Sequence, residues 1–202
     1  MRYTLTDENA LVLDYTATTD APTIINLTNH SYFNLEGQSS GSMLEQTLRL
    51  NASTFPEGNA ETCPTGRILP VAGTPMDFTR AKPIGRDIQA EYSQLQMCGG
   101  YDHNFILDKE PGMLALAAVA RSEKTGITME TYTTQPGVQL YTSNSLQNDT
   151  RPGKTGGIYG RYQGFCLETQ HYPCTPSHPE FPSVELLSLI HISEPTRLAL
   201  IS

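Results

Sequence analysis

The amino-acid sequence predicts an all-β protein, an antiparallel β-sandwich formed as one domain. Apolar residues recur with period two in several short segments, which is typical of strands that bury one face. Turn-forming residues separate these segments at spacings too short for long helices, which favours antiparallel pairing. A chain of 202 residues, of which 38% are hydrophobic, can bury a core of its own.

The predicted strands follow one another between clusters of Gly, Pro, Asn and Glu. The clearest alternating segments are residues 10–15, 23–27, 46–50, 104–107 and 126–132. The turn formers between them lie at 57–59, 73–75, 110–112 and 135–137.

Two shorter elements need separate arguments. Residues 114–120 are rich in alanine and would suit a helix, but turn formers frame the segment on both sides, so we expect a hairpin strand. A short helix is expected at residues 83–88, because proline can occupy the first turn of a helix.

Composition excludes several classes of partner. The formal net charge is −8, and the 13 Lys and Arg residues are scattered, so we expect no binding to nucleic acid. No apolar stretch approaches the roughly 20 residues that span a bilayer, so we expect no membrane partner. The four cysteines lack CxxC spacing, which favours reduced thiols and a cytoplasmic location.

Both ends of the chain are unusual. Residues 1–5 begin in the middle of a strand pattern, so we expect further sequence upstream. Residues 187–197, LSLIHISEPTR, match a conceptual translation of a transposase-type sequencing adapter over eleven residues. We therefore predict one partial domain over residues 1–186 and a non-native, adapter-derived tail over 187–202. A genuine C-terminal amphipathic helix is the alternative for the tail.

A histidine follows the predicted strand at 23–27. His30 lies in residues 26–35, NLTNHSYFNL, where a strand end can hold its imidazole over a cleft. Alone, such a histidine is more often a hydrogen-bonded structural group than a catalyst. This ten-residue segment, however, resembles the signature around the catalytic histidine of the aldose 1-epimerase family.

A carboxylate ends another apolar strand pattern. Glu168 lies in residues 164–173, GFCLETQHYP, and alone it could be a solvated strand end. In the family that it resembles, the LETQ string carries the general base, which implies that role for Glu168. Residues 178–183, HPEFPS, are also similar to the family's stretch before its final strands.

Two further segments between these motifs resemble the family. Residues 99–107, GGYDHNFIL, are similar to its GYDH segment, which implies that Asp102 accepts hydrogen bonds from sugar hydroxyls. Residues 134–144, TQPGVQLYTSN, are similar to its PGVQ segment, which implies that Gln139 contacts the sugar. A turn cap and an exposed turn glutamine are the competing interpretations. Alternation along a strand points His103 away from Asp102, so we expect a structural role for that histidine.

The resemblance covers residues 2–183. It implies a galactose mutarotase-like supersandwich and an isomerase that interconverts the α and β anomers of free hexoses. The implied partner is a small-molecule aldohexose, galactose or glucose, with no cofactor and no metal. Full-length members also have an upstream arginine and histidine that bind substrate, and they end in further strands. No segment here matches these parts, so we expect an incomplete sandwich and a weakly active or inactive fragment.

The chemistry explains why such a reaction needs this pair. Opening the sugar ring removes the proton of the C1 hydroxyl and donates one to the ring oxygen, so a base and an acid must flank one hemiacetal. An ionised Glu168 suits the first role and a protonated His30 the second, and attraction between opposite charges favours these two states. Asp102 and Gln139 would orient hydroxyls.

Three alternatives stay open. Glu168, His171, Cys174 and His178 have spacings that could suit zinc, although three prolines make this loop extended. A glycosidase with two carboxylates would need Asp102 as the partner of Glu168. The chain could also be a non-catalytic sugar-binding module, because folds do not fix activities.

Overall fold

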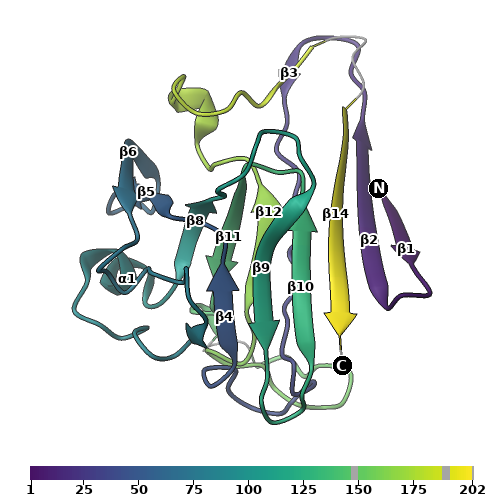
Figure 1. The fold of residues 1–202 in the computed structure, drawn as a ribbon. Coiled ribbons are helices and arrows are strands. Elements are labelled where there is room, and N and C mark those ends of the chain that lie inside the picture. The colour runs from purple at the N-terminus through teal and green to yellow at the C-terminus, as the bar shows by residue number, and fades with distance from the viewer. Residues whose placement is uncertain (147–149, 188–191, 202) are drawn as a thin grey trace.

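The computed structural model describes residues 1–146, 150–187 and 192–201. Its strands form two large antiparallel sheets and a small ribbon (Figure 1). In spatial order, the seven-stranded sheet contains β1 (Arg2–Leu5), β2 (Ala10–Ala17), β14 (Ile192–Ile201), β10 (Thr128–Thr133), β9 (Ala115–Arg121), β4 (Thr47–Leu50) and β7 (Lys82–Pro83).

The second sheet has five strands and positions most of the residues discussed below. Its order is β12 (Cys166–Gln170), β11 (Gly137–Tyr141), β8 (Asp102–Ile106), β5 (Thr54–Gly58) and β6 (Pro64–Pro70). The ribbon pairs β13 (Glu185–Leu186) with β3 (Thr23–Ile24), and the helical elements are α1 (Ser93–Cys98) and a 3-10 turn, η2 (Thr175–Ser177).

One hydrophobic core joins the inner faces of the two large sheets. Leu48 of β4 and Ala118 of β9 belong to the same buried cluster as Phe55 of β5 and Phe105 of β8. Phe55 and Phe105 have no exposed surface, and their ring centroids lie 6.2 Å apart. Burying a phenylalanine side chain contributes roughly 1.5–3 kcal/mol. The predicted antiparallel sandwich is therefore confirmed.

The individual strand predictions have mixed outcomes. The segments at 10–15, 46–50, 104–107 and 126–132 all contain strands, and residues 114–120 form most of β9 rather than a helix. The segment at 23–27 forms a strand only at Thr23–Ile24.

The helix predicted at residues 83–88 is wrong. Lys82–Pro83 is a short strand beside β4, and the backbone N–H groups of Ile84 and Gly85 donate to the carbonyls of Gln46 and Leu44. Pairing with β4 holds Lys82–Pro83 in an extended conformation, and the next two amides continue this contact, so the chain does not start a helix at Pro83. The helix instead spans Ser93–Cys98 and ends at Gly99, whose left-handed φ of 65° suits glycine.

The described part of the C-terminal segment is a strand. β14 pairs with β2 on one side and with β10 on the other (Figure 1). A helix is therefore wrong for Ile192–Ile201, whereas residues 188–191 lie outside the described part of the chain. The boundary at residue 186 and the origin of the tail stay predictions. Among the described residues, no helix has the length and apolar character to cross a bilayer.

Candidate active site

A β-bridge brings the two predicted catalytic residues together. The N–H of Phe33 donates to the carbonyl of Phe165 at 2.8 Å, and the N–H of Phe165 donates back at 2.9 Å. This bridge ties the loop that carries His30 to the residue before β12, which carries Glu168. The two motifs therefore meet through backbone hydrogen bonds.

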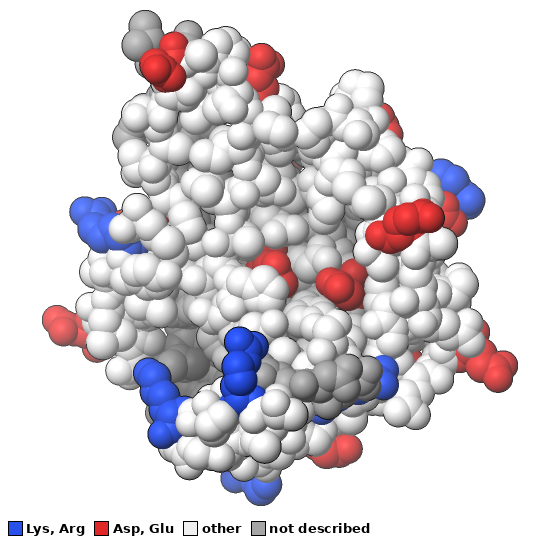
Figure 2. Space-filling view, turned by 180° about the vertical axis from the view of Figure 1, so that it is seen from behind, with Lys and Arg blue, Asp and Glu red and all other residues white. Residues whose placement is uncertain are grey.

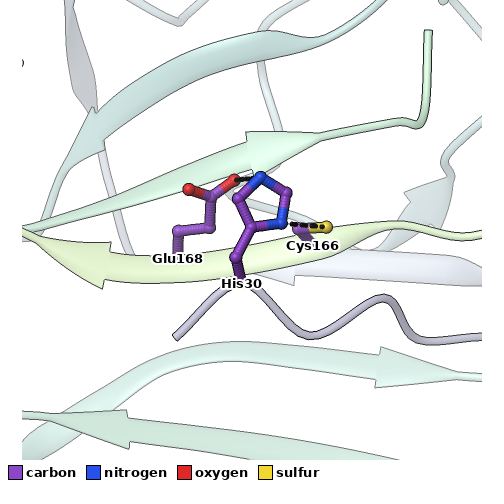
Figure 3. A group of neighbouring side chains, drawn as sticks. All are labelled: His30, Cys166 and Glu168. Atoms are coloured by element: carbon purple, nitrogen blue, oxygen red, sulfur yellow. Dashed lines mark hydrogen bonds and ion pairs between the residues drawn. The ribbon is translucent and has the colours of Figure 1, made fainter. Parts of the chain in front are cut away.

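His30 and Glu168 face each other across a short gap. Nε2 of His30 lies 3.4 Å from Oε1 of Glu168, and Figure 3 shows the imidazole edge directed at the carboxylate. The His30 side chain is 49% exposed, whereas that of Glu168 is 11% exposed. One partner is therefore open to solvent while the other lies at the base of the site.

The electrostatics of the site favour a proton-accepting carboxylate. Burial raises the pKa of Glu168, an effect that His30 opposes and the charge of Asp102 reinforces. Burial also raises the pKa of Asp102, although a hydrogen bond from Gln139 and the nearby His30 oppose this effect. A carboxylate with a raised pKa is a stronger base than an exposed one.

A cleft of about 270 Å³ contains this pair. No Lys or Arg is among the described residues that line it, and its charged carboxylates are Asp102 and Glu168. Figure 2 shows acidic side chains near the middle of one face of the molecule, with Lys and Arg nearer its rim. The lining residues are His30, Tyr32, Asp102, Gln139, Tyr141, Ser145, Glu168 and Gln170.

The two predicted binding residues are neighbours on adjacent strands. Nε2 of Gln139 donates to Oδ1 of Asp102 at 2.8 Å, and Gln139 lies opposite Glu168 in the β11–β12 register. Oε1 of Gln139 is buried without a hydrogen-bond partner among the described residues. A buried amide oxygen without a partner is costly, so it is available to a ligand hydroxyl.

The structure brings all four predicted site residues to one cleft and adds others. Tyr32 and Tyr141 flank the imidazole of His30, with ring centroids at 5.1 Å and 6.0 Å from it. Burial raises the pKa of Tyr32 to about 12, so its hydroxyl stays protonated and can donate a hydrogen bond. The tyrosines supply a flat, partly polar wall of the cleft.

The sequence contained a signal for several of these added residues. Side chains at i and i+2 of a strand share a face. Tyr141 follows Gln139 at this spacing, and Cys166 and Gln170 flank Glu168 at the same spacing. Ser145 carried no such signal, because it lies beyond the end of β11.

Cys166 is the unexpected neighbour of His30. Its Sγ lies 3.4 Å from Nδ1 of the imidazole, on the other side of the ring from Glu168 (Figure 3). His30, Cys166 and Glu168 form the one cluster of metal-ligating type found among the described residues, with ligand atoms within 4.8 Å of one another. Cys166 has no exposed surface, however, and burial raises the pKa of its thiol, which disfavours the thiolate that binds metals.

The other histidines have different surroundings. His103 is buried against Phe55 and does not line the cleft, and burial lowers its pKa to about 4. This agrees with the expectation that it faces away from Asp102. The alternative zinc set is not assembled, because no cluster of metal-ligating type among the described residues contains His171, Cys174 or His178.

Comparison with known proteins identifies the family of the chain. The model of the family described as aldose 1-epimerase matches residues 1–188. Galactose mutarotase from Homo sapiens is 41% identical over 186 residues, covering 91% of this chain and 52% of that protein. Aldose 1-epimerase from Haemophilus influenzae is 40% identical over 182 residues, covering 89% of this chain and 51% of that protein.

The fold is also similar to solved structures. An aldose epimerase homologue from C. elegans superposes with a TM-score of 0.85 at 29% identity, covering 98% of this chain and 58% of that one. A galactose 1-epimerase from Lactobacillus acidophilus gives a TM-score of 0.83 at 28% identity, covering 98% of this chain and 55% of that one. The chain spans about half the length of the curated relatives it matches. On its sequence and its fold alike, the chain belongs to the aldose 1-epimerase family.

Proposed function

We propose that this chain carries the acid/base pair of an aldose 1-epimerase, an isomerase that interconverts the α and β anomers of a free aldohexose. The observation that carries the proposal is the 3.4 Å approach of His30 Nε2 to Glu168 Oε1 within a polar cleft. A base and an acid held this close can act on neighbouring oxygens of one hemiacetal.

In the proposed reaction, Glu168 takes the proton from the C1 hydroxyl while His30 donates a proton to the ring oxygen. The bond between C1 and the ring oxygen breaks, and C1 becomes the carbonyl of the open aldehyde. Rotation about C1–C2 presents the other carbonyl face. The former ring oxygen, now a hydroxyl, then attacks C1. His30 takes the proton of this hydroxyl, and Glu168 returns a proton to the carbonyl oxygen, which becomes the new C1 hydroxyl. Both groups end as they began.

The environments of the two groups suit these roles. Burial raises the pKa of Glu168 and so makes it a better base. The half-exposed His30 can exchange its proton with solvent between turnovers. This reaction transfers protons and no electrons, so we propose that it proceeds without a redox cofactor. We also propose that the acid/base pair acts without a metal.

We propose galactose or glucose as the substrate. The names of the relatives support a sugar, because they read galactose mutarotase and aldose 1-epimerase. In the cleft, Asp102 would accept hydrogen bonds from ring hydroxyls, and Oε1 of Gln139 would accept another. The cleft volume of about 270 Å³ lies near the lower end of ligand sites, which suits a monosaccharide.

Cellular location and chain boundaries complete the proposal. All four cysteines are free thiols, which suits the reducing cytoplasm. We also propose that the family-derived part ends near residue 186, and the family model ends close by, at residue 188. Sequencing genomic DNA across this junction tests the boundary, and a native reading frame that continues through residues 187–197 would overturn it.

Polarimetry tests the activity. Freshly dissolved α-D-galactose or α-D-glucose is followed with this chain and with the complete product of its gene. The complete product is expected to exceed the spontaneous rate. This chain, which spans about half of its relatives, is expected to be slower or inactive. No acceleration by the complete product would contradict the proposed activity, and hydrolysis of an aryl glycoside would indicate a glycosidase instead.

A further inference from the structure

We propose that Cys166 is a positioning residue for His30, which holds the imidazole with Nε2 towards Glu168 through a hydrogen bond at Nδ1. The inference deepens the proposed function and rests on it for its catalytic meaning. The structural claim about the imidazole can be tested without turnover.

Cys166 and Glu168 contact different nitrogens of the His30 ring. Sγ of Cys166 lies 3.4 Å from Nδ1 of His30, and Oε1 of Glu168 lies 3.4 Å from Nε2. Figure 3 shows the ring between these two side chains. Cys166 and Glu168 share one face of β12, so one strand contacts both nitrogens of the ring. Two contacts on different nitrogens fix which nitrogen faces the carboxylate.

The aromatic neighbours of the His30 ring do not select between its two nitrogens. The imidazole is 49% exposed, and its ring neighbours, Tyr32 and Tyr141, make aromatic contacts that do not distinguish the two nitrogens. No other hydrogen-bond partner of Nδ1 is found within the described ranges 1–146, 150–187 and 192–201. The thiol is therefore the polar contact at Nδ1, and together with Glu168 at Nε2 it selects one orientation.

The Cys166 thiol can act as donor or as acceptor towards Nδ1 of His30. His30 must change protonation state during the proposed reaction, so its partner at Nδ1 must tolerate both states. When Nδ1 carries a proton, that N–H donates to Sγ, and when it does not, the S–H donates to Nδ1. Burial raises the pKa of the Cys166 thiol, which keeps it neutral. A carboxylate in this place would add a charge and hold the imidazole protonated.

Nitrogen-15 NMR of the imidazoles tests the claim on this chain. The His30 signals are assigned by their loss in His30→Ala, and the tautomer is read at a pH where His30 is neutral. We expect widely separated shifts for the two ring nitrogens, with the proton on Nε2. Averaged shifts in the unmodified chain would overturn the proposal without any further variant.

Two substitutions separate hydrogen bonding from packing. Cys166→Val fills the space without a polar atom, whereas Cys166→Ser keeps a group that can donate and accept. We expect the valine variant to bring the two His30 shifts closer together, because Glu168 alone then biases the ring, and the serine variant to keep them as far apart as in the unmodified chain. Cys98→Ala is the matched control, because Sγ of Cys98 lies 3.9 Å from Nε2 of His103, outside the cleft. It should alter the His103 signals alone. Unchanged His30 shifts in a folded valine variant would overturn the proposal.

Activity gives the functional readout in the complete gene product. Cys166→Val is expected to lower kcat about fivefold to tenfold, as for the loss of one hydrogen bond, with KM unchanged because Cys166 does not line the cleft. Cys166→Ser should recover most of the rate. A fall in the valine variant that serine does not recover would indicate a packing effect and overturn the positioning role. A complete product without mutarotase activity would instead overturn the proposed function, while the NMR result still decides the orientation of His30.

Discussion

Phe33 and Phe165 exchange two backbone hydrogen bonds, and this bridge sets the distance between His30 and Glu168. Their rings also pack together, with centroids 6.0 Å apart. The loop that carries His30 is therefore anchored to the β12 segment three residues after His30 and three residues before Glu168. Because each bridge residue is only three positions from the site residue, the bridge can hold His30 of the loop against Glu168 of the strand.

Removing either member of the pair should abolish most of the activity of the complete gene product. General acid or base catalysis by one group contributes about 10²- to 10⁴-fold, so His30→Ala and Glu168→Gln should each lower kcat by roughly this factor. Polarimetry measures the change. His178→Ala and Glu123→Gln are the controls, because neither residue lines the cleft. Wild-type rates in His30→Ala or Glu168→Gln would contradict the assigned roles.

The pH dependence should report the environment of Glu168. Its carboxylate is the active form, and its pKa lies above the ordinary value of 4.5, so kcat/KM should fall with acidification at a higher pH than for an exposed glutamate. Asp102→Asn removes a charge that raises this pKa and should move the acid limb to lower pH. The profile is measured by polarimetry. An acid limb that moves upward would contradict this coupling.

The Glu168 carboxylate should lower the free energy of unfolding at neutral pH. Because the pKa of Glu168 is raised on folding, the folded state binds a proton more tightly than the unfolded state, so this group lowers stability as pH rises through the folded pKa. Glu168→Gln should therefore stabilise this chain at neutral pH, by about 0.5–2 kcal/mol. Thermal melting should show the gain at pH 7 and a smaller one in acid. A gain that grew in acid would oppose this explanation.

Substrate binding should depend on Gln139. Gln139→Leu keeps the approximate size of the side chain but removes its donor to Asp102 and its buried oxygen. Loss of about 1–1.5 kcal/mol of binding should raise KM by roughly tenfold with a smaller change in kcat. Steady-state kinetics of the complete product separate the two constants. A loss confined to kcat would assign Gln139 to proton transfer instead.

A buried cation outside the cleft offers a test of the fold alone. Nζ of Lys82 is almost fully buried and donates to Oδ2 of Asp87 at 2.7 Å and to the carbonyl of Pro75 at 2.6 Å. Asp87→Asn should destabilise the chain by about 2–4 kcal/mol, because an unpaired charge is left inside. Adding Lys82→Met should recover much of this loss in chemical denaturation. Additive losses in the double variant would contradict a coupled pair.

The sandwich was predictable because period-two patterning is local and strong. The segments that became β2, β4, β8 and β10 carried that pattern, and a one-residue shift would turn each apolar set towards solvent. The helix predicted at 83–88 failed because pairing with β4 is a tertiary effect. Hydrogen bonds to Gln46 and Leu44 outweighed a local preference for a proline-led turn.

The site was predictable in part for a different reason. His30, Asp102, Gln139 and Glu168 came from resemblance to a family, and the structure places all four at one cleft. Cys166 was within reach of a simple alternation argument, since it precedes Glu168 by two residues on the same strand. Its contact with Nδ1 was not, because that contact depends on the loop position that the Phe33–Phe165 bridge sets.

The central place of β14 has a consequence for how the molecule behaves in solution. β2 and β10 do not pair with each other, and β14 alone joins them in the sheet. Without residues 192–201, both strands would present a row of unpaired backbone groups, which are templates for the strands of other molecules. A segment that pairs with both β2 and β10 at this position therefore protects the sheet against edge-to-edge aggregation. We expect the tendency of the protein to aggregate to depend on this segment, which lies in a sheet that contributes no strand residue to the candidate cleft.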